Sequence, residues 1–189
     1  MQAFYALIDR LERCNAEEKK AHEEMLWATF GLDACVLALD MSGFSRTVHA
    51  TGIVSYLARI RRMQQLSSPL VLAHGGEVVK YTADNLMAVF SDAGNALQAA
   101  KAIRHACISL PEPLEVSMGL DIGRFLYVPH TDCFGDPVNV AFKLAEDIAG
   151  NGEILASSAV FVSAGHAAPA SGWSESDISG LDIAYAAVP

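Results

Sequence analysis

The stretch at residues 74–90, HGGEVVKYTADNLMAVF, most strongly limits what this chain can fold into, because it joins two strand-like runs through a short polar turn. Before the turn, Val78, Lys80 and Thr82 would share one face of an extended segment. The turn reads Ala-Asp-Asn, and Asp and Asn tolerate the positive φ values that hairpins need. The stretch therefore predicts a β-hairpin, in which Asp84 could be only a turn former and Lys80 only a solvated charge.

The composition is typical of one globular domain and not of a disordered or nucleic-acid-binding chain. The chain has 189 residues, of which 52% are hydrophobic, so it can bury a substantial core. The formal net charge of −9 comes from 22 acidic and 13 basic side chains, whereas phosphate binding depends on clustered Lys and Arg. We therefore expect no nucleic-acid partner, and a polyphosphate substrate would need metal ions to offset its charge.

The cysteines and the apolar runs indicate a cytoplasmic protein. The four cysteines, Cys14, Cys35, Cys107 and Cys133, form neither a CxxC metal motif nor a dense disulfide pattern. The apolar run at residues 34–39 is far shorter than the roughly 20 residues that cross a bilayer. The first residues also lack the basic and then apolar pattern of a signal peptide. We expect reduced thiols and no membrane span.

Residues 1–31 are predicted to form a helix that precedes the main domain, which takes up residues 32–189. Apolar residues recur at helical spacing from Phe4 to Leu7 and beyond, and a charged run, AEEKKAHEE, follows them. Gly31 suits the end of this helix. The apolar heptad fails within the charged run, so a solvated helix stands as an alternative to one that packs on the domain or pairs with a second copy.

Residues 34–39, ACVLAL, form a continuous apolar run that predicts a strand buried on both faces. The run ends at Asp40, which places a carboxylate at the mouth of a core strand. Alternatively, Asp40 or Ser42 only caps the next helix. That helix is predicted to end at Ser67-Ser68-Pro69. Its predicted apolar face consists of Ile53, Leu57, Ile60 and Met63.

The second half of the chain repeats this alternation of helix and strand. A helical pattern at residues 96–107 stops at Pro111. An alternating strand follows at residues 114–122, and Gly123 would let the chain bend into a short strand at residues 125–128. The tail is predicted to contain a strand at residues 153–156, a short helix near Ala159 and a last strand at residues 183–188, with a loop of small residues before that strand.

A helix start is predicted at Gly135-Asp136-Pro137, with Asp136 as the N-cap and Pro137 in the first helical position. On this helix Asn139 and Lys143 are four residues apart and share a face. The order strand, helix, hairpin, helix, strand resembles a ferredoxin-like βαββαβ core with a C-terminal elaboration, an α+β fold. Because that fold supports many activities, the site must decide the function.

Four short motifs follow one another along the chain. They are LDMSGF at residues 39–44, GGEVVK at residues 75–80 followed by Ala83-Asp84, GLDIG at residues 119–123, and DCFGDPVN at residues 132–139. Each motif is weak alone, but their order and spacing resemble the catalytic domain of class III nucleotidyl cyclases. The resemblance extends from residue 34 to residue 157 and continues more weakly to the end of the chain.

The resemblance implies that the domain cyclises a nucleoside triphosphate, with the ribose 3′ oxygen attacking the α-phosphate and pyrophosphate leaving. The family's reaction requires two divalent metal ions, Mg²⁺ or Mn²⁺, which take carboxylate oxygens as ligands. By the same resemblance Asp40 and Asp84 are the metal ligands. This role would account for one carboxylate at the end of a core strand and another in a turn.

The pair of positions that selects the base in this family matches Lys80 and Asp132. A lysine donor and a carboxylate acceptor complement adenine, so the resemblance implies ATP as the substrate. Cys133 is adjacent, but the spacing to the following Phe-Gly favours Asp132. Asn139 matches the residue that orients the ribose. Arg124 matches an arginine on the triphosphate, although it could equally be an exposed strand charge.

The chain departs from the family pattern at several positions. Lys143 stands where a transition-state arginine is usual, so the positive charge is kept without the planar two-pronged contact with phosphate. Ser179 stands where many members place a phosphate-binding lysine. Ala83 and Asn85 replace the usual glycines beside Asp84, which bears on turn geometry more than on charge.

These observations lead to a first hypothesis of an adenylate cyclase that makes cyclic AMP as a homodimer, because the family's sites combine residues of two chains. Slow turnover is expected from the departures at Lys143 and Ser179. The alternative is a degenerate cyclase domain that binds nucleotide or only dimerises as a regulatory module. A ferredoxin-like nucleic-acid binder is disfavoured by the negative charge.

Overall fold

The computed structural model describes residues 1–43, 48–50, 52–167, 169 and 172–189. It is an α+β fold with an eight-stranded sheet in the order β2-β3-β1-β4-β6-β8-β7, and β5 pairs with β4 off this path. The strands are β1 Gly31–Met41, β2 Gly76–Thr82, β3 Asn85–Phe90, β4 Val116–Val128, β5 Asp132–Phe134, β6 Ile154–Ser157, β7 Ser174–Ile178 and β8 Leu181–Ala187.

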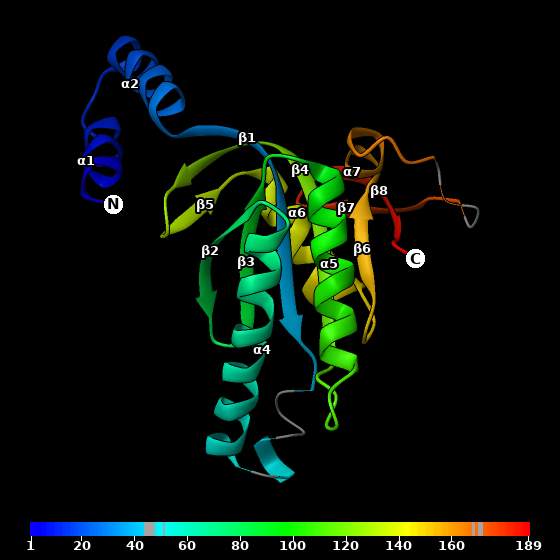
Figure 1. Cartoon of the computed structure of the whole chain (residues 1–189). Helices are drawn as coiled ribbons and strands as arrows, with labels where there is room; N and C mark the ends of the chain where they lie inside the picture. Colours follow the sequence, from blue (N-terminus) through cyan, green and yellow to red (C-terminus); the bar gives the residue numbers. More distant parts are fainter. Residues whose placement is uncertain (44–47, 51, 168, 170–171) are drawn as a thin grey trace.

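Helices cover both faces of the sheet (Figure 1). Helices α4 and α5 lie on one face, and α6 lies on the other. The helices are α1 Gln2–Leu11, α2 Ala16–Phe30, α4 Ile53–Ala73, α5 Ala93–Ile108, α6 Asp136–Lys143, the π-helical turn η1 Leu144–Ile148, and α7 Ser158–Ser163. The elements from β1 to β4 run in the order β1-α4-β2-β3-α5-β4, so the predicted βαββαβ core is confirmed.

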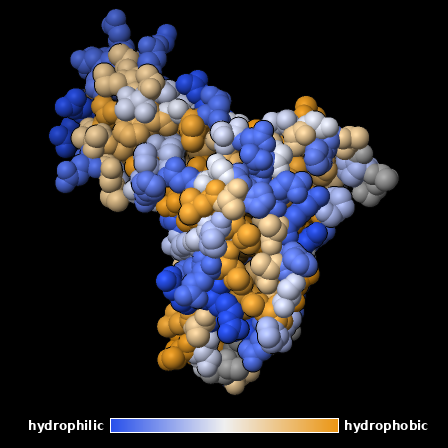
Figure 2. All heavy atoms as spheres, viewed as in Figure 1, coloured by the Kyte–Doolittle hydropathy of each residue, from blue (hydrophilic) through white to orange (hydrophobic). Residues whose placement is uncertain are grey.

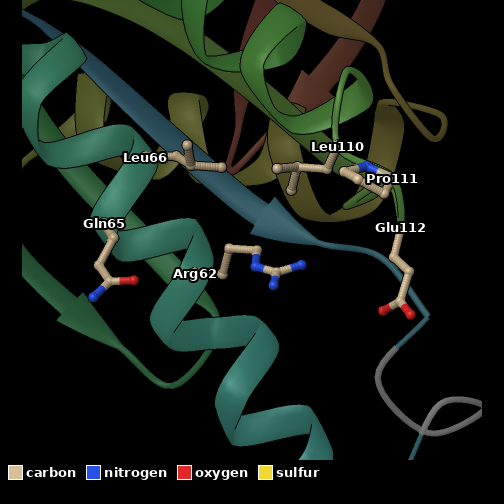
Figure 3. Close-up of a pocket in the computed structure, with 6 residues that line it drawn as sticks. All are labelled: Arg62, Gln65, Leu66, Leu110, Pro111 and Glu112. Carbon is tan, nitrogen blue, oxygen red and sulfur yellow. The ribbon is translucent and has the colours of Figure 1, made fainter.

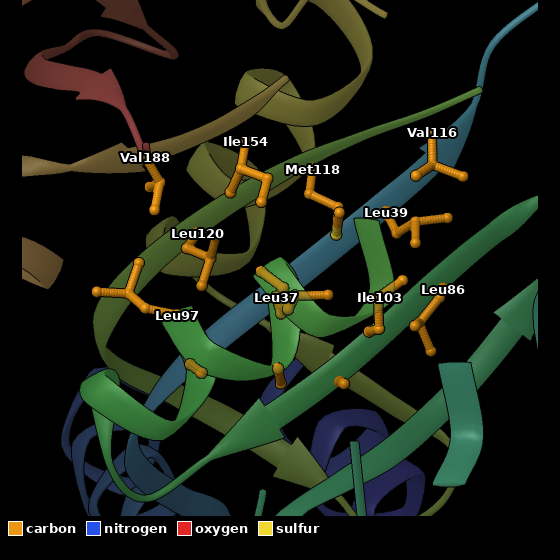
Figure 4. Packing of buried hydrophobic residues seen from close by; sticks show 14 of the residues in the cluster. Leu37, Leu39, Leu86, Leu97, Ile103, Val116, Met118, Leu120, Ile154 and Val188 are labelled. Atoms are coloured by element: carbon orange, nitrogen blue, oxygen red, sulfur yellow. The ribbon is translucent and has the colours of Figure 1, made fainter. Parts of the chain in front are cut away.

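Strand β1 occupies the middle of the sheet, antiparallel to β3 on one side and to β4 on the other. Leu37 and Leu39 point into the cluster beneath α4 and α5, which Figure 4 shows from close by. Val36 and Ala38 point into the cluster on the α6 face. Burial on both faces explains the uninterrupted apolar run, and it confirms the predicted core strand.

Helix α4 differs from its prediction in both face and length. Ile53 and Leu57 are 49% and 54% exposed, so half of the predicted apolar face is wrong, and Figure 2 shows apolar surface at the end of the molecule where α4 begins. The side chains that α4 buries are Tyr56, Ile60, Met63, Ser67 and Val71. The helix also continues through Pro69 to Ala73, because tertiary packing on the sheet outweighs the local helix-breaking signal.

The predicted hairpin is confirmed as β2 and β3, but its alternation is wrong. A β-bulge shifts the register between Val78 and Lys80. Val78 lies opposite Ala88 on the α4 and α5 face, whereas Lys80 lies opposite Met87, which packs on the other face. Because a bulge adds one residue to a strand, it turns the following side chains over. Lys80 therefore points toward β5 and not toward α4.

Two helices replace the single N-terminal helix of the prediction. The break comes at Asn15, whose Oδ1 accepts hydrogen bonds from the backbone N–H groups of Glu17 and Glu18, each at 3.0 Å. The Glu18 carboxylate accepts the Asn15 N–H in return, which completes a capping box. Helix α2 ends at Phe30, with Gly31 as its C-cap, as expected. The capping box at Asn15 thus starts a new helix, although the apolar helical spacing continues across this position.

Strand β4 is also longer than predicted, because it continues through Gly123 without a break. A Cβ atom at Gly119 would lie 2.0 Å from the carbonyl oxygen of Ala141, and one at Gly123 would lie 2.9 Å from Pro137. The two glycines therefore allow α6 to pack closely on the strand. Helix α6 has Gly135 as its N-cap, so Asp136 is the first helical residue and not the cap.

The C-terminal region contains the expected β6, α7 and β8. Strand β7 was missed, since the segment before the last strand was predicted to be a loop. It pairs with β8 through a turn at Ser179 and Gly180, which have φ values of 56° and 84°. None of the helices in the described part of the chain combines the length and the apolar character that a membrane crossing requires.

Candidate active site

The two predicted metal ligands come together at one end of the sheet. Asp40 directly follows the continuous buried run at residues 34–39 of β1, and Asp84 lies in the turn between β2 and β3. Leu39 pairs with Leu86 across β1 and β3, so the next residue of β1 lies beside the hairpin turn. Burial, together with the negative charges of Asp84 and then Glu146, raises the pKa of Asp40 to about 6. The site thus concentrates negative charge in a partly dehydrated place.

Asp84 has a hydrogen-bond partner that the sequence did not reveal. The hydroxyl of Tyr56, on α4, donates to Asp84 Oδ2 at 2.9 Å. The Tyr56 side chain is only 1% exposed. Burial, and then the bond to Asp84, raises the pKa of Tyr56 above its ordinary value, so the hydroxyl keeps its proton. The signal available was the buried i, i+4, i+7 face that Tyr56 forms with Ile60 and Met63.

Glu146 is a second residue that was missed. It lies in η1, and its Oε1 accepts a hydrogen bond of 2.5 Å from the Asn85 side chain, directly after Asp84. Burial raises the pKa of Glu146, and the nearby charges of Asp147 and Asp84 raise it further. No local pattern marks this residue, because the contact joins positions 61 residues apart.

The donors present suit a hard divalent cation. Carboxylate oxygens are preferred ligands of Mg²⁺ and Mn²⁺, and Mg²⁺ is typically held by one or two carboxylates together with substrate phosphates and water. Neither Asp40 nor Asp84 forms an ion pair with a basic side chain of the described residues. The same part of the chain contains no group of three or more His, Cys, Asp or Glu side chains arranged to hold a metal ion.

The predicted base-selecting residues are in direct contact. Lys80 Nζ lies 2.7 Å from Asp132 Oδ2, and the two side chains are 33% and 27% exposed. Asp132 Oδ1 also accepts the backbone N–H of Cys133 at 2.9 Å. The Cys133 side chain is only 4% exposed and packs in the cluster on the α6 face. Asp132, and not its neighbour, therefore presents its side chain to Lys80.

Asn139 and Lys143 both lie on the exposed side of α6, as their spacing predicts. Lys143 Nζ forms an ion pair of 2.5 Å with Asp147 Oδ2, one turn further on. In the described part of the chain, no hydrogen bond or ion pair joins Asn139 or Lys143 to Asp40 or Asp84. Within one chain, the two residues of α6 therefore form a group separate from the two aspartates.

Arg124 is in contact with the N-terminal helices. Its guanidinium carbon lies 5.0 Å from the centroid of the Trp27 ring on α2, a cation–π contact. Ser179, in the β7–β8 turn, belongs to the opposite end of the strand order from the hairpin that carries Asp84. Phe44, the last residue of the first motif, lies outside the described residues.

A surface pocket lies between α4 and the segment that joins α5 to β4 (Figure 3). It is lined by Arg62, Gln65, Leu66, Leu110, Pro111 and Glu112. None of the candidate site residues is among them. The pocket is therefore separate from the carboxylate pair and from the base-selecting pair.

Comparisons with known proteins point to one family, although no family model matches the chain. The chain is 32% identical over 117 residues to the Rhizobium meliloti (strain 1021) protein named "Putative adenylate cyclase 3", a match that covers 59% of this chain and 20% of that protein. This chain thus spans about a fifth of the length of that curated relative.

Two solved structures resemble most of the chain. The adenylate/guanylate cyclase/hydrolase from Silicibacter pomeroyi is 27% identical, with a TM-score of 0.66 over 82% of this chain and 95% of that one. The dimeric guanylyl cyclase domain of the RhoGC fusion protein from Blastocladiella emersonii has a TM-score of 0.69 at 17% identity, with the same coverage. Taken with the four motifs and the sheet order, these similarities support the assignment of the chain to the class III nucleotidyl cyclase family.

Proposed function

We propose that this domain is an adenylate cyclase, which converts ATP to 3′,5′-cyclic AMP and pyrophosphate. The observation that carries the proposal is the contact between Lys80 and Asp132. An ammonium donor suits a ring nitrogen of adenine, and a carboxylate acceptor suits its exocyclic amine. Guanine presents a carbonyl and a protonated ring nitrogen at these edges, so the same pair would leave polar groups unmatched.

At the α-phosphorus the reaction makes one bond and breaks one. The ribose 3′ oxygen gives its proton to solvent and attacks the α-phosphorus, and the bond from that phosphorus to the bridging oxygen of pyrophosphate breaks. Asp40 and Asp84 would hold the divalent cations, which lower the pKa of the attacking hydroxyl and offset phosphate charge when bound. Asn139 would orient the ribose, and Lys143 would place a positive charge near the transition state.

We further propose that the site forms between two copies of the chain. Among the described residues of one chain, no hydrogen bond or ion pair joins Asn139 or Lys143 to the aspartate pair, and a two-fold dimer would bring one group from each copy together. Each site would then take Asp40 and Asp84 from one chain and Lys80, Asp132, Asn139 and Lys143 from the other. For Arg124 to reach a triphosphate, it would have to leave the Trp27 ring.

A degenerate domain that binds nucleotide without turnover is the second candidate. The ion pair between Lys143 and Asp147 favours it, because a lysine already neutralised by a carboxylate is less available to phosphate. The intact carboxylate pair favours the enzyme, because two close carboxylates without a metal role would only be unfavourable.

The direct test is incubation of purified protein with ATP and Mn²⁺, followed by measurement of cyclic AMP and pyrophosphate. Formation of both products in equal amounts is expected, and GTP should be converted more slowly. Nucleotide binding without either product would support the degenerate domain. Equal turnover of ATP and GTP would contradict the assignment of the base-selecting pair.

Complementation tests the shared site. Asp40→Ala and Asn139→Ala should each inactivate their own homodimer, whereas a mixed dimer keeps one intact site of two. Random exchange makes about half of the dimers mixed, so roughly a quarter of the original activity should return. Absence of recovery, with subunit exchange demonstrated by differently labelled chains, would place both residues in one site of a single chain.

A further inference from the structure

Tyr56 is an unusual member of the core. It is the first residue on the buried face of α4, and most of the cluster around it is apolar. Its hydroxyl donates a hydrogen bond of 2.9 Å to Asp84 Oδ2, which lies outside that cluster. The bond connects a rigid helix to the turn between β2 and β3, across 28 residues of sequence. A buried side chain thus contacts the carboxylate that is proposed to bind metal.

The turn that carries Asp84 needs such support. Ala83 has a φ of 51° where the family usually has glycine, a strained conformation for a residue with a Cβ. A carboxylate on a short turn can rotate about two side-chain bonds, and a hydrogen bond to one oxygen restricts both rotations. With Oδ2 engaged by Tyr56, Oδ1 is the oxygen left to face a cation.

A second contact fixes the other side of the same turn. Asn85 donates to Glu146 in η1 at 2.5 Å, so the residue after Asp84 is tethered to the α6 face while Asp84 itself is tethered to α4. Residues that hydrogen-bond a metal-ligating carboxylate set its orientation, and their loss typically weakens metal binding by about 10- to 100-fold.

We propose that Tyr56 is a positioning residue for the metal ligand Asp84. The inference rests on the proposed metal role of Asp84. Tyr56 does not touch substrate in this scheme, and it acts by fixing one carboxylate oxygen so that the other is directed to the cation. Loss of the hydroxyl should therefore weaken metal binding without preventing folding.

Tyr81 provides a matched control on the same interface. Its hydroxyl bonds to Ser67 at 2.9 Å and Ser68 at 2.8 Å, both on α4. It therefore also links α4 to the hairpin, but it has no contact with Asp84 among the described residues. Tyr81→Phe removes the same chemical group as Tyr56→Phe, and the two variants differ in whether a metal ligand loses a partner.

The experiment measures Mn²⁺ binding to the nucleotide-free protein from the electron paramagnetic resonance signal of free Mn²⁺. Tyr56→Phe should weaken binding about tenfold or more, whereas Tyr81→Phe should stay within about twofold of the unmodified protein. Thermal unfolding and circular dichroism check that both variants fold. Tyr56→Leu removes the same donor with a smaller side chain, and it should give the same weakening if the Phe variant folds poorly.

The possible results distinguish a failure of the positioning role of Tyr56 from a failure of the metal role of Asp84. If the unmodified protein binds Mn²⁺, Asp84→Asn does not, and Tyr56→Phe binds as well as the unmodified protein, then Tyr56 is only a core residue. If Asp84→Asn binds Mn²⁺ as well as the unmodified protein, the metal role of Asp84 is wrong and the inference falls with it. In turnover assays, saturating Mn²⁺ should restore most of the kcat of Tyr56→Phe.

Discussion

The aspartate pair and the base-selecting pair differ in how their charges are balanced. Lys80 and Asp132 have opposite charges and meet at 2.7 Å. Asp40 and Asp84 have like charges, and Glu146 adds a third carboxylate to their surroundings. The first pair is electrostatically complete before any ligand arrives, whereas the second becomes favourable only when a cation binds.

The difference has consequences for binding. Because the Lys80–Asp132 pair is about a third exposed, it contributes at most about 1 kcal/mol to stability, and a base can replace it at little cost. Burial, and then the charges of Asp84 and Glu146, raise the pKa of Asp40 to about 6, so the charged form of Asp40 is disfavoured in the metal-free protein. On the proposed function, a bound cation would offset these charges, and a bound nucleotide would exchange one set of polar contacts for another.

The largest effect is expected from Asp84→Asn. Turnover with ATP and Mn²⁺ should fall about a thousandfold or more, since several kcal/mol of charge stabilisation is lost. The melting temperature of the metal-free protein should not fall, because the substitution removes repulsion with Asp40 and keeps an oxygen that can accept the Tyr56 hydroxyl. A large fall in the melting temperature of the metal-free variant would contradict the conclusion that Asp40 and Asp84 repel each other without a cation.

Lys143→Ala should have the next largest effect. If its charge contacts phosphate mainly in the transition state, kcat should fall about 100-fold while KM changes less. Lys19→Ala, which removes an exposed lysine on α2, serves as the control and should leave both constants unchanged. Unaltered turnover of Lys143→Ala would mean that this lysine forms its ion pair with Asp147 and does not contribute to catalysis.

The double variant Lys80→Glu with Asp132→Cys tests the base-selecting pair. The ratio of kcat/KM for ATP to that for GTP should fall about tenfold or more, because each mismatched polar contact costs about 1–3 kcal/mol. Mn²⁺ binding to the nucleotide-free protein should stay the same, since in the described part of the chain no hydrogen bond or ion pair joins Lys80 or Asp132 to the aspartate pair. An unchanged ratio in a folded double variant would mean that other residues read the base.

The smallest effect is expected from Glu146→Gln. This substitution keeps an oxygen for the Asn85 side chain and removes one negative charge near Asp40. Mn²⁺ affinity should fall about two- to fivefold, as expected for a charge that acts through partly exposed surroundings. Glu112→Gln, an exposed site in the separate pocket of Figure 3, is the matched control. Equal affinities in both variants would exclude Glu146 from the electrostatics of the metal site.

Local sequence patterns predicted much of this molecule. The apolar run of β1 and the hairpin each carry their signal within a few residues, because periodicity and turn chemistry act over short distances. The order of these elements was enough to predict the α+β core. The spacing of four motifs was enough to indicate the family and to single out the two aspartates, which stand where local patterns end.

Tertiary structure decided the features that depend on contacts distant in sequence. The β-bulge that turns Lys80 toward Asp132 arises from pairing with β3, and no residue type in β2 marks it. The face that α4 buries was set by packing on the sheet, which made Tyr56 a partner of Asp84. Sequence by itself determined the strands and helices of the βαββαβ core, since those depend largely on local backbone energetics. Only the folded chain determined which side chains meet, because a contact such as Asn85 with Glu146 joins residues that no local pattern connects.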